Sequence, residues 1–166
     1  MKLILLNGPP GSGKSTLARR YADNHPPALA LDVDRIRAMI GGRRASPAEA
    51  GVLARDIAVA AARTHLGAGH DVVVPQLVVR AGFPERLEAL AGECGASFHE
   101  VVLLPGREAV RRRFSARGSS EVEVAAPLTE PELDQAYNAV AAFAARRGVP
   151  VLTAADAYPA LLAALT

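Results

Sequence analysis

The chain has 166 residues, half of them hydrophobic, and its 19 Lys and Arg residues outnumber its 17 Asp and Glu residues by only two. This length fits a single domain with a substantial buried core. Aromatic residues make up 4% of the chain and Trp is absent, so the core has to be built from Ala, Val, Leu and Ile, as in parallel sheets covered by helices. The small net charge of +2 argues against a broad nucleic-acid-binding surface.

The cysteine content and the hydrophobic pattern bear on the cellular compartment. Cys94 is the single cysteine, which excludes an intramolecular disulfide bond and fits a reducing cytoplasm. The apolar residues 3–6 are followed at once by Asn7-Gly8-Pro9 and are too few for a secretion signal. No stretch is long enough to span a membrane. We therefore expect a cytoplasmic protein whose residues 1–166 form one domain.

The first strand, predicted at residues 2–6, leads into a phosphate-binding loop. Gly8-Pro9-Pro10-Gly11-Ser12-Gly13-Lys14-Ser15 matches the P-loop pattern, and a helix is predicted at 14–23. The backbone N–H groups of such a loop converge on phosphate oxygens, and the helix points its N-terminus at the same charge. Lys14 would bind the β- and γ-phosphates of ATP, and the Ser15 hydroxyl is placed to ligate Mg²⁺. The predicted nucleotide-binding residues are Gly8, Gly11, Ser12, Gly13, Lys14, Ser15 and Thr16.

A pair of carboxylates follows the second predicted strand, residues 28–31, at the start of a predicted helix, residues 32–40. A phosphoryl acceptor has to lose its hydroxyl proton as it attacks, and a positioned carboxylate can accept that proton. Asp34 is the candidate catalytic base. Asp32 is the alternative base, and it is otherwise placed to cap the helix or to help hold Mg²⁺. Arg37 lies one turn beyond Asp34, where it could hold an anionic or polar part of the acceptor.

The third predicted strand, residues 71–75, ends in an uncharged sequence. Many P-loop proteins carry an acidic residue at this point, but here the strand ends in Pro75-Gln76. Gln76 can form a hydrogen bond with an acceptor or with a metal-bound water, although it brings no charge. We expect Gln76, Arg80 and Phe83 to line the acceptor pocket, ahead of a helix at 84–92.

An arginine-rich helix, predicted at residues 107–117, follows the fourth predicted strand, residues 97–104. Guanidinium groups stabilise the negative charge that spreads over the transferring phosphoryl group. Arg113 and Arg117 are four residues apart and share one helical face. They are the predicted catalytic arginines of a lid at about 111–128, and Arg113 is also expected to bind the nucleotide.

The remaining elements complete an alternation of strands and helices. A long helix should run from Ser46-Pro47-Ala48-Glu49 to about residue 66, and another should run from Thr129-Glu130-Pro131-Glu132 to Arg147. Both starts have the pattern of a capping box. A short strand at 149–153 and a small helix close the chain. The alternation predicts an open parallel α/β sheet with helices on both faces and ligands beyond the carboxyl ends of its strands.

Together these features resemble the small P-loop kinases that phosphorylate hydroxyl groups. This group includes chloramphenicol phosphotransferase, polynucleotide 5′-hydroxyl kinases, zeta-type toxin kinases and related ATP-binding proteins of the AAA_33 type. The resemblance is specific at residues 8–16, 32–37 and 111–118. It implies a three-layer P-loop NTPase fold, similar to nucleoside-monophosphate kinases, with a five-stranded parallel sheet in the order 2-3-1-4-5. It also implies that Asp34 is the base and that Arg37 matches an arginine that contacts the acceptor's phosphate in polynucleotide kinases.

The chain departs from the polynucleotide-type kinases after the third strand. Those relatives carry an acidic stretch with Thr or Asn, where this chain has Pro75-Gln76-Leu77. This difference and the absence of clustered aromatic residues weigh against a nucleic-acid acceptor.

The sequence therefore predicts an ATP- and Mg²⁺-dependent phosphotransferase that moves the γ-phosphoryl group to a hydroxyl of a small molecule. An antibiotic, a nucleoside and a sugar all remain open as acceptors. One alternative is a kinase of polynucleotide 5′-hydroxyl ends or of a nucleotide-sugar, and another is a non-catalytic ATP-binding switch. The expected partners are a nucleotide donor and a small-molecule acceptor, with no membrane contact. No motif that would read a purine base is evident, so ATP and GTP are not distinguished.

Overall fold

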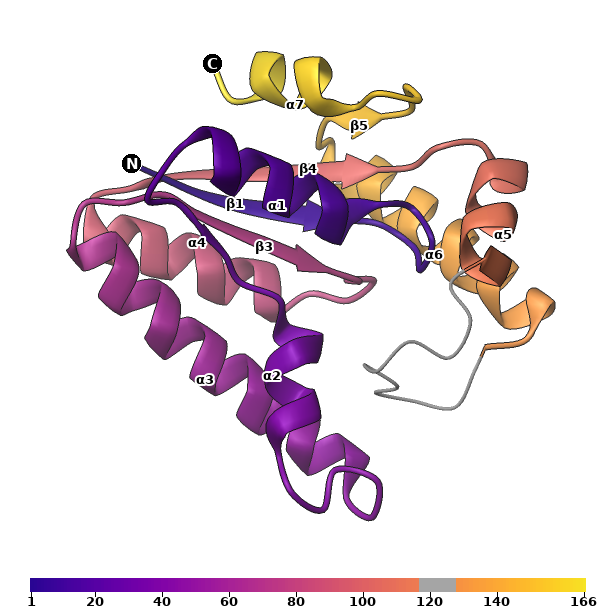
Figure 1. Cartoon of the computed structure of the whole chain (residues 1–166), viewed down its shortest axis with the longest axis horizontal. Helices are drawn as coiled ribbons and strands as arrows, with labels where there is room; N and C mark the ends of the chain where they lie inside the picture. Colours follow the sequence, from indigo (N-terminus) through magenta and orange to yellow (C-terminus); the bar gives the residue numbers. More distant parts are fainter. Residues whose placement is uncertain (117–127) are drawn as a thin grey trace.

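The computed structural model describes residues 1–116 and 128–166, and its sheet confirms the predicted fold. The five strands are all parallel and run in the order β2-β3-β1-β4-β5 (Figure 1). They are β1 (Lys2–Asn7), β2 (Leu29–Ala30), β3 (Val72–Gln76), β4 (Ser97–Leu103) and β5 (Val151–Leu152). The helices are α1 (Lys14–Asn24), α2 (Val33–Met39), α3 (Pro47–Gly67), α4 (Phe83–Cys94), α5 (Arg107–Ala116), α6 (Glu130–Arg147) and α7 (Tyr158–Ala164).

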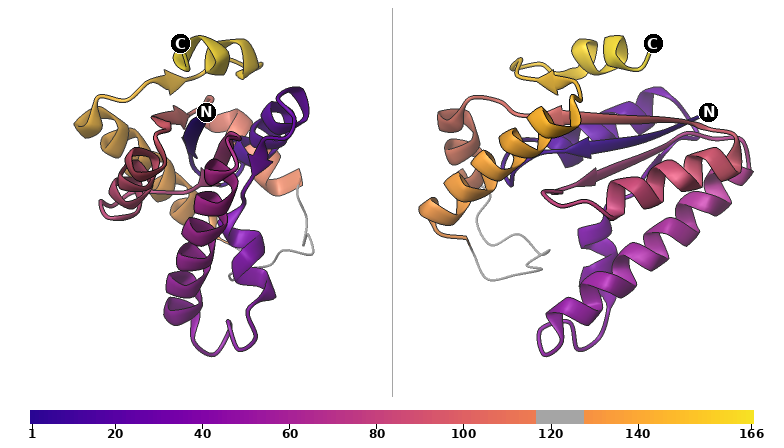
Figure 2. Two further views of the ribbon diagram at one scale, coloured as in Figure 1. Left: turned by 90° about the vertical axis from the view of Figure 1, so that its left-hand side faces the viewer. Right: turned by 180° about the vertical axis from the view of Figure 1, so that it is seen from behind.

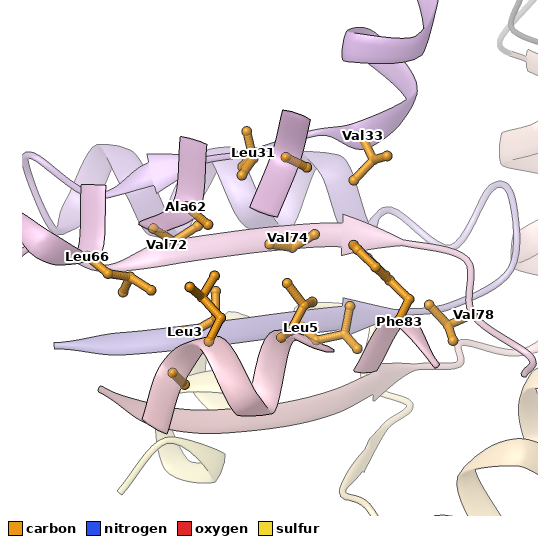
Figure 3. Close-up of a cluster of buried hydrophobic side chains, with 14 of the residues drawn as sticks. Leu3, Leu5, Leu31, Val33, Ala62, Leu66, Val72, Val74, Val78 and Phe83 are labelled. Atoms are coloured by element: carbon orange, nitrogen blue, oxygen red, sulfur yellow. The ribbon is translucent and has the colours of Figure 1, made fainter. Parts of the chain in front are cut away.

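The central strand β1 is buried on both faces and so joins two hydrophobic clusters. Successive side chains of a strand point to opposite faces of the sheet. Leu3 and Leu5 belong to a cluster that they share with α3 and α4, part of which is shown in Figure 3. Ile4 and Leu6 belong to a second cluster, formed with α1 and α7. These two clusters create the three layers of the fold, with the sheet between the helices (Figure 2).

Two helix starts test the predicted capping boxes, with opposite results. At α6 the Thr129 side chain accepts a hydrogen bond from the backbone N–H of Glu132, whose carboxylate accepts one from the N–H of Thr129, so that capping box is confirmed. At α3 the Ser46 side chain makes no capping hydrogen bond, so that prediction is wrong. Ser46 instead takes part in the tight turn before the helix, where its backbone N–H donates to the carbonyl of Gly42.

The parallel direction of the strands gathers their carboxyl ends at one edge of the sheet. The P-loop follows β1 there, α2 begins just beyond β2, and α5 begins just beyond β4 (Figure 1). The carboxyl edge is therefore where the predicted site residues are expected to lie.

In the part of the chain that the structure describes, no helix is both long enough and apolar enough to cross a bilayer.

Candidate active site

The P-loop lies directly against β4 and α5, and two of its glycines make this contact possible. A Cβ atom on Gly8 would lie 2.6 Å from the carbonyl oxygen of Leu103, at the end of β4. A Cβ atom on Gly11 would lie 2.6 Å from the carbonyl oxygen of Val110, in α5. Gly11 also has a φ angle of 80°, which L side chains rarely adopt. Glycine is thus required at both positions for the loop to pack as it does.

The Ser15 hydroxyl and the Asp32 carboxylate, the predicted metal ligands, lie together. Ser15 Oγ donates a hydrogen bond of 3.2 Å to Asp32 Oδ2. The other carboxylate oxygen, Oδ1, accepts from the backbone N–H of Asp34 at 3.1 Å and so caps α2. Asp32 therefore caps the helix, and its second carboxylate oxygen lies beside the Ser15 hydroxyl, both oxygens being of the kind that Mg²⁺ prefers.

Ser15 and Asp32 alone would supply only part of a metal coordination shell. Among the described residues there is no group of three or more His, Cys, Asp or Glu side chains that could hold a metal ion. Mg²⁺ commonly binds through one or two protein ligands together with substrate phosphates and water. Ser15 and Asp32 fit that pattern, in which the nucleotide completes the shell.

Asp34 lies half-buried in the first turn of α2, where charged groups of α2 and of the P-loop shift the pKa of its carboxyl group. Burial of the carboxyl group, and then the neighbouring charge of Asp32, raise the pKa of Asp34. The positive charges of Lys14 and Arg37 act in the opposite direction. The structure therefore brings the candidate base within electrostatic reach of the P-loop lysine. Lys14 itself lies across the loop, and its Nζ donates to the carbonyl of Pro9 at 3.2 Å.

Arg113 is the arginine of α5 that reaches the P-loop. Its guanidinium donates to the carbonyl oxygen of Ser12 at 3.1 Å. Arg111 points elsewhere, since its guanidinium lies 2.5 Å from the carboxylate of Asp134 in α6. The other predicted catalytic arginine, Arg117, lies outside the described residues, as does most of the predicted lid at 111–128.

The predicted acceptor-side residues are placed in different ways. Arg37 is half-buried and donates through its NH2 group to the carbonyl of Pro47 at the start of α3, at 2.9 Å. Gln76 ends β3, and its Oε1 atom is buried with no hydrogen-bond partner among the described residues. Arg80 is exposed in the loop between β3 and α4.

Phe83 is buried in the hydrophobic core, so its position gives no support to the prediction that it lines the acceptor pocket. It is the first residue of α4, its exposed fraction is 9%, and it belongs to the buried cluster beneath the sheet. In Figure 3 its ring lies close to Leu5, Val74 and Val78. The ring is placed in the core because the helix begins at Phe83 itself, one residue earlier than predicted, and turns this residue toward the sheet.

A cavity of about 370 Å³ adjoins the P-loop on its α1 side, and several of its residues were not predicted. Arg20 and the loop before α7 form its outer part, where the Arg20 guanidinium lies 2.8 Å from the Asp156 carboxylate. The sequence signal for this loop was only its position after a strand at the carboxyl edge, since no motif marks it. The cavity is lined by Gly11, Ser12, Gly13, Thr16, Leu17, Arg20, Leu103, Arg113, Ala154, Ala155, Asp156 and Ala157.

Comparison with known sequences identifies the family. The AAA_33 family, described as an AAA domain, matches residues 3–143, which is most of the chain. A search of curated proteins returned no match.

Comparison with solved structures identifies similar folds at low sequence identity. A presumed kinase from Chloroflexus aurantiacus is 20% identical, with a TM-score of 0.69, over 92% of this chain and 86% of that one. A chain of the Pnkp1/Rnl/Hen1 RNA repair complex is 18% identical, with a TM-score of 0.72, over 87% of this chain and 45% of that one. The tunicamycin resistance protein of Deinococcus radiodurans is 18% identical, with a TM-score of 0.53, over 89% of this chain and 96% of that one. These similarities establish a P-loop fold of the kind found in kinases.

Proposed function

The chain belongs to the AAA domain family, and from this basis we propose that it is an ATP- and Mg²⁺-dependent kinase acting on a hydroxyl group of a small molecule. The observation that carries the proposal is the position of Asp34, a half-buried carboxyl group with a raised pKa that responds to the charge of Lys14. A module that only bound a nucleotide would need the P-loop but no base beside it. A kinase that acts on a hydroxyl group gains rate from a base placed beside the P-loop.

The donor side of the proposed site is built from the P-loop and the cavity beside it. Lys14 and the backbone N–H groups of residues 11–15 would hold the phosphates, as they do in P-loops generally. Ser15 and Asp32 would hold Mg²⁺, which neutralises charge on the phosphates when it is bound. The cavity between α1 and residues 154–157 supports a position for the nucleotide base next to Arg113.

The transfer step assigns one role to each of two side chains. The acceptor oxygen forms a bond to the γ-phosphorus while the bond from that phosphorus to the β,γ-bridging oxygen breaks, and ADP leaves. Asp34 takes the proton of the acceptor hydroxyl. Arg113, whose guanidinium lies at the P-loop, stabilises the negative charge of the moving phosphoryl group. Arg117 remains the second arginine proposed for this role.

The acceptor side is proposed to consist of Asp34, Arg37, Gln76 and Arg80. The buried, unpartnered Oε1 of Gln76 favours an acceptor that donates a hydrogen bond, such as a second hydroxyl. This supports a small polar molecule, such as an antibiotic, a nucleoside or a sugar, as the acceptor. We expect the reaction to take place in the cytoplasm.

The experiment is to incubate the protein with Mg·ATP and pooled acceptors, and to follow phosphate adducts by mass. The pools are aminocyclitols, phenicols, nucleosides, sugars and 5′-hydroxyl oligonucleotides. A product in one small-molecule pool supports the proposal and identifies the acceptor class. A product only with oligonucleotides would favour a polynucleotide kinase, and no product despite tight ATP binding would favour a nucleotide-binding switch.

Variants of the two central side chains test the assigned roles. Asp34→Asn should leave ATP affinity nearly intact and lower turnover by roughly two orders of magnitude, as expected for a lost general base. Lys14→Ala should impair ATP use with every acceptor. Asp23→Asn, at an exposed carboxylate near the end of α1, is the matched control and should change neither quantity. Unchanged turnover in Asp34→Asn would mean that Asp34 is not the base and only occupies the first turn of α2.

A further inference from the structure

Asn7, the last residue of β1, is a fully buried polar side chain whose amide connects two loops of the site. Its exposed fraction is 0%. Its Oδ1 atom accepts from the backbone N–H of Gly8 at 2.8 Å and from that of Val78 at 2.9 Å. Its Nδ2 atom donates to the carbonyl of Val78 at 2.8 Å. The side chain thus joins the start of the P-loop to the loop that follows β3.

The chemistry of the amide explains why asparagine suits this position. A carboxamide presents a donor and an acceptor side by side, as a peptide group does, and no shorter side chain offers both in one plane. The β1–β3 pairing ends at Asn7 and Gln76. The Asn7 side chain continues this pairing beyond the strands by binding both backbone groups of Val78. A hydrophobic or charged side chain here would leave buried backbone groups without partners.

The loop that Asn7 holds follows Gln76, the last residue of β3, and contains Arg80, so it adjoins two of the proposed acceptor-side residues. Gln76 lies two residues before Val78, and Arg80 lies two residues after it. The Val78 side chain is buried in the cluster shown in Figure 3, so the loop is anchored from the core as well as by the amide. The amide is the direct hydrogen-bonded connection from this loop to Gly8.

We propose that Asn7 is a positioning residue that holds the acceptor-side loop, residues 77–80, in register with the P-loop, so that donor and acceptor meet at the correct separation. This inference rests on the proposed kinase function for its kinetic consequence, since a misplaced loop would weaken acceptor binding. Its structural consequence, the anchoring of Val78, is independent of any activity.

Two substitutions at Asn7 separate the two connections. Asn7→Asp keeps an oxygen for the N–H groups of Gly8 and Val78 but replaces the donor to the Val78 carbonyl by a second oxygen. We expect it to raise the acceptor KM about tenfold and to change ATP affinity less than about threefold. Asn7→Leu removes both connections and should weaken ATP binding and acceptor binding together. Burial favours the protonated form of the new carboxyl group, whose hydroxyl can donate to the Val78 carbonyl, so the KM is compared at a pH high enough to ionise it. An Asn7→Asp variant whose acceptor KM is unchanged under that condition would overturn the proposal.

The control has to lose stability without touching the loop. Leu66→Ala opens a space at a fully buried side chain that lies at the other end of the cluster from Val78 (Figure 3). It should lower the free energy of unfolding and leave the acceptor KM as in the wild type. A similar rise in acceptor KM in Leu66→Ala would show that lost stability alone accounts for the effect, and would overturn the proposal.

Amide hydrogen exchange, followed by NMR, tests the anchoring without any turnover. In Asn7→Leu the Val78 amide should exchange at least about tenfold faster, because its N–H has lost the buried acceptor that Asn7 provides. The amide of Val102, which donates to the carbonyl of Pro150 on the opposite side of β1, should exchange as in the wild type. Equal exchange of the Val78 amide in both proteins would overturn the proposal. If the wild type phosphorylates no acceptor, the proposed function fails, and this measurement still decides the role of Asn7.

If the Asn7 variants do not fold, the proposal can be tested by amide exchange in the wild-type protein, with and without a bound nucleotide. Binding of a non-hydrolysable ATP analogue fixes the P-loop and, through the Asn7 amide, should slow exchange of the Val78 amide more than that of Val102. Equal effects on the two amides would overturn the proposal.

Discussion

At the scale of single residues, the charge state of Asp34 would decide whether the proposed reaction can begin. The proposed base can act only when it is deprotonated, so kcat/KM should fall as the pH drops through the pKa of Asp34. Burial and the Asp32 carboxylate raise this pKa above the ordinary range of an aspartate. The acid limb of the rate profile should therefore lie at a higher pH than a free aspartate would give.

Arg37 provides a test of this assignment, because its positive charge lowers the pKa of Asp34. Arg37→Gln removes that charge, so the pKa of Asp34 should rise and the acid limb of kcat/KM should move to higher pH. Arg37→Lys keeps the charge and should return the limb toward its wild-type position. The measurement is a pH profile of kcat/KM, with Arg35→Gln, at an exposed arginine of the same helix, as control. A limb that stays in place or moves to lower pH would contradict the assignment.

At the scale of elements, the P-loop depends on how closely α5 approaches it. The gap at Gly11 has no room for a side chain, since a Cβ atom would lie 2.6 Å from the carbonyl of Val110. The same approach brings Arg113 to the carbonyl of Ser12. The loop and the helix therefore form one unit, and a side chain inserted between them should disturb both.

Gly11→Ala tests this unit, and Gly42→Ala is its matched control. Both glycines have positive φ, 80° and 71°, so both variants pay a backbone strain of about 1 kcal/mol. A Cβ atom on Gly42 meets nothing within 4 Å, whereas one on Gly11 meets the backbone of α5. Gly11→Ala should weaken Mg·ATP binding at least about tenfold, measured by calorimetry, whereas Gly42→Ala should not. Equal ATP affinity in the two variants would show that α5 can move away from Gly11 without disturbing the P-loop.

The elements also show which features could be predicted from the sequence. The motif at residues 8–15 and the alternation of apolar runs with helical segments identified the parallel sheet and the positions of Lys14, Ser15, Asp32 and Asp34, because these features are local. The burial of Phe83 was not predicted, because the direction of its side chain depends on where α4 begins. The loop at 154–157 was missed because it approaches the P-loop only through the tertiary fold.

At the scale of the whole molecule, the small net charge conceals an uneven distribution. Residues 33–46 contain four arginines and a single carboxylate, Asp34, and residues 105–116 contain four arginines and a single carboxylate, Glu108. Both segments follow strands at the carboxyl edge of the sheet. Arginines are therefore concentrated at this edge more than a net charge of +2 suggests, although Asp32 and the Asp134 partner of Arg111 offset part of their charge.

One arginine, Arg147, connects α6 to two other elements. Arg147, at the end of α6, donates from Nε to Glu100 in β4 and from NH1 to Glu85 in α4, both at 2.7 Å. The Glu100 side chain is 3% exposed. Burial raises the pKa of Glu100, although its contact with Arg147 opposes the rise. The contact with Arg147 therefore offsets the cost of burying the negative charge of Glu100.

Arg147→Ala should destabilise the fold in a way that depends on pH. At neutral pH the variant leaves the Glu100 carboxylate buried without its partner, which should cost about 3 kcal/mol in the free energy of unfolding. The pKa of Glu100 in the folded state then rises further above its value in the unfolded chain. A group with a raised folded pKa stabilises the fold at low pH and loses that contribution as the pH rises through the folded pKa. The deficit relative to the wild type should therefore be larger at neutral pH than in mild acid.

Urea unfolding of both proteins at neutral and mildly acidic pH measures this deficit. The double variant Arg147→Ala/Glu100→Gln should recover part of the neutral-pH loss, because its buried side chain carries no charge. Arg146→Ala, at the exposed neighbouring arginine, is the control and should show a small deficit that hardly changes with pH. A deficit in Arg147→Ala that is the same at both pH values would mean that lost packing of the arginine side chain, and not the unpaired carboxylate of Glu100, accounts for the instability.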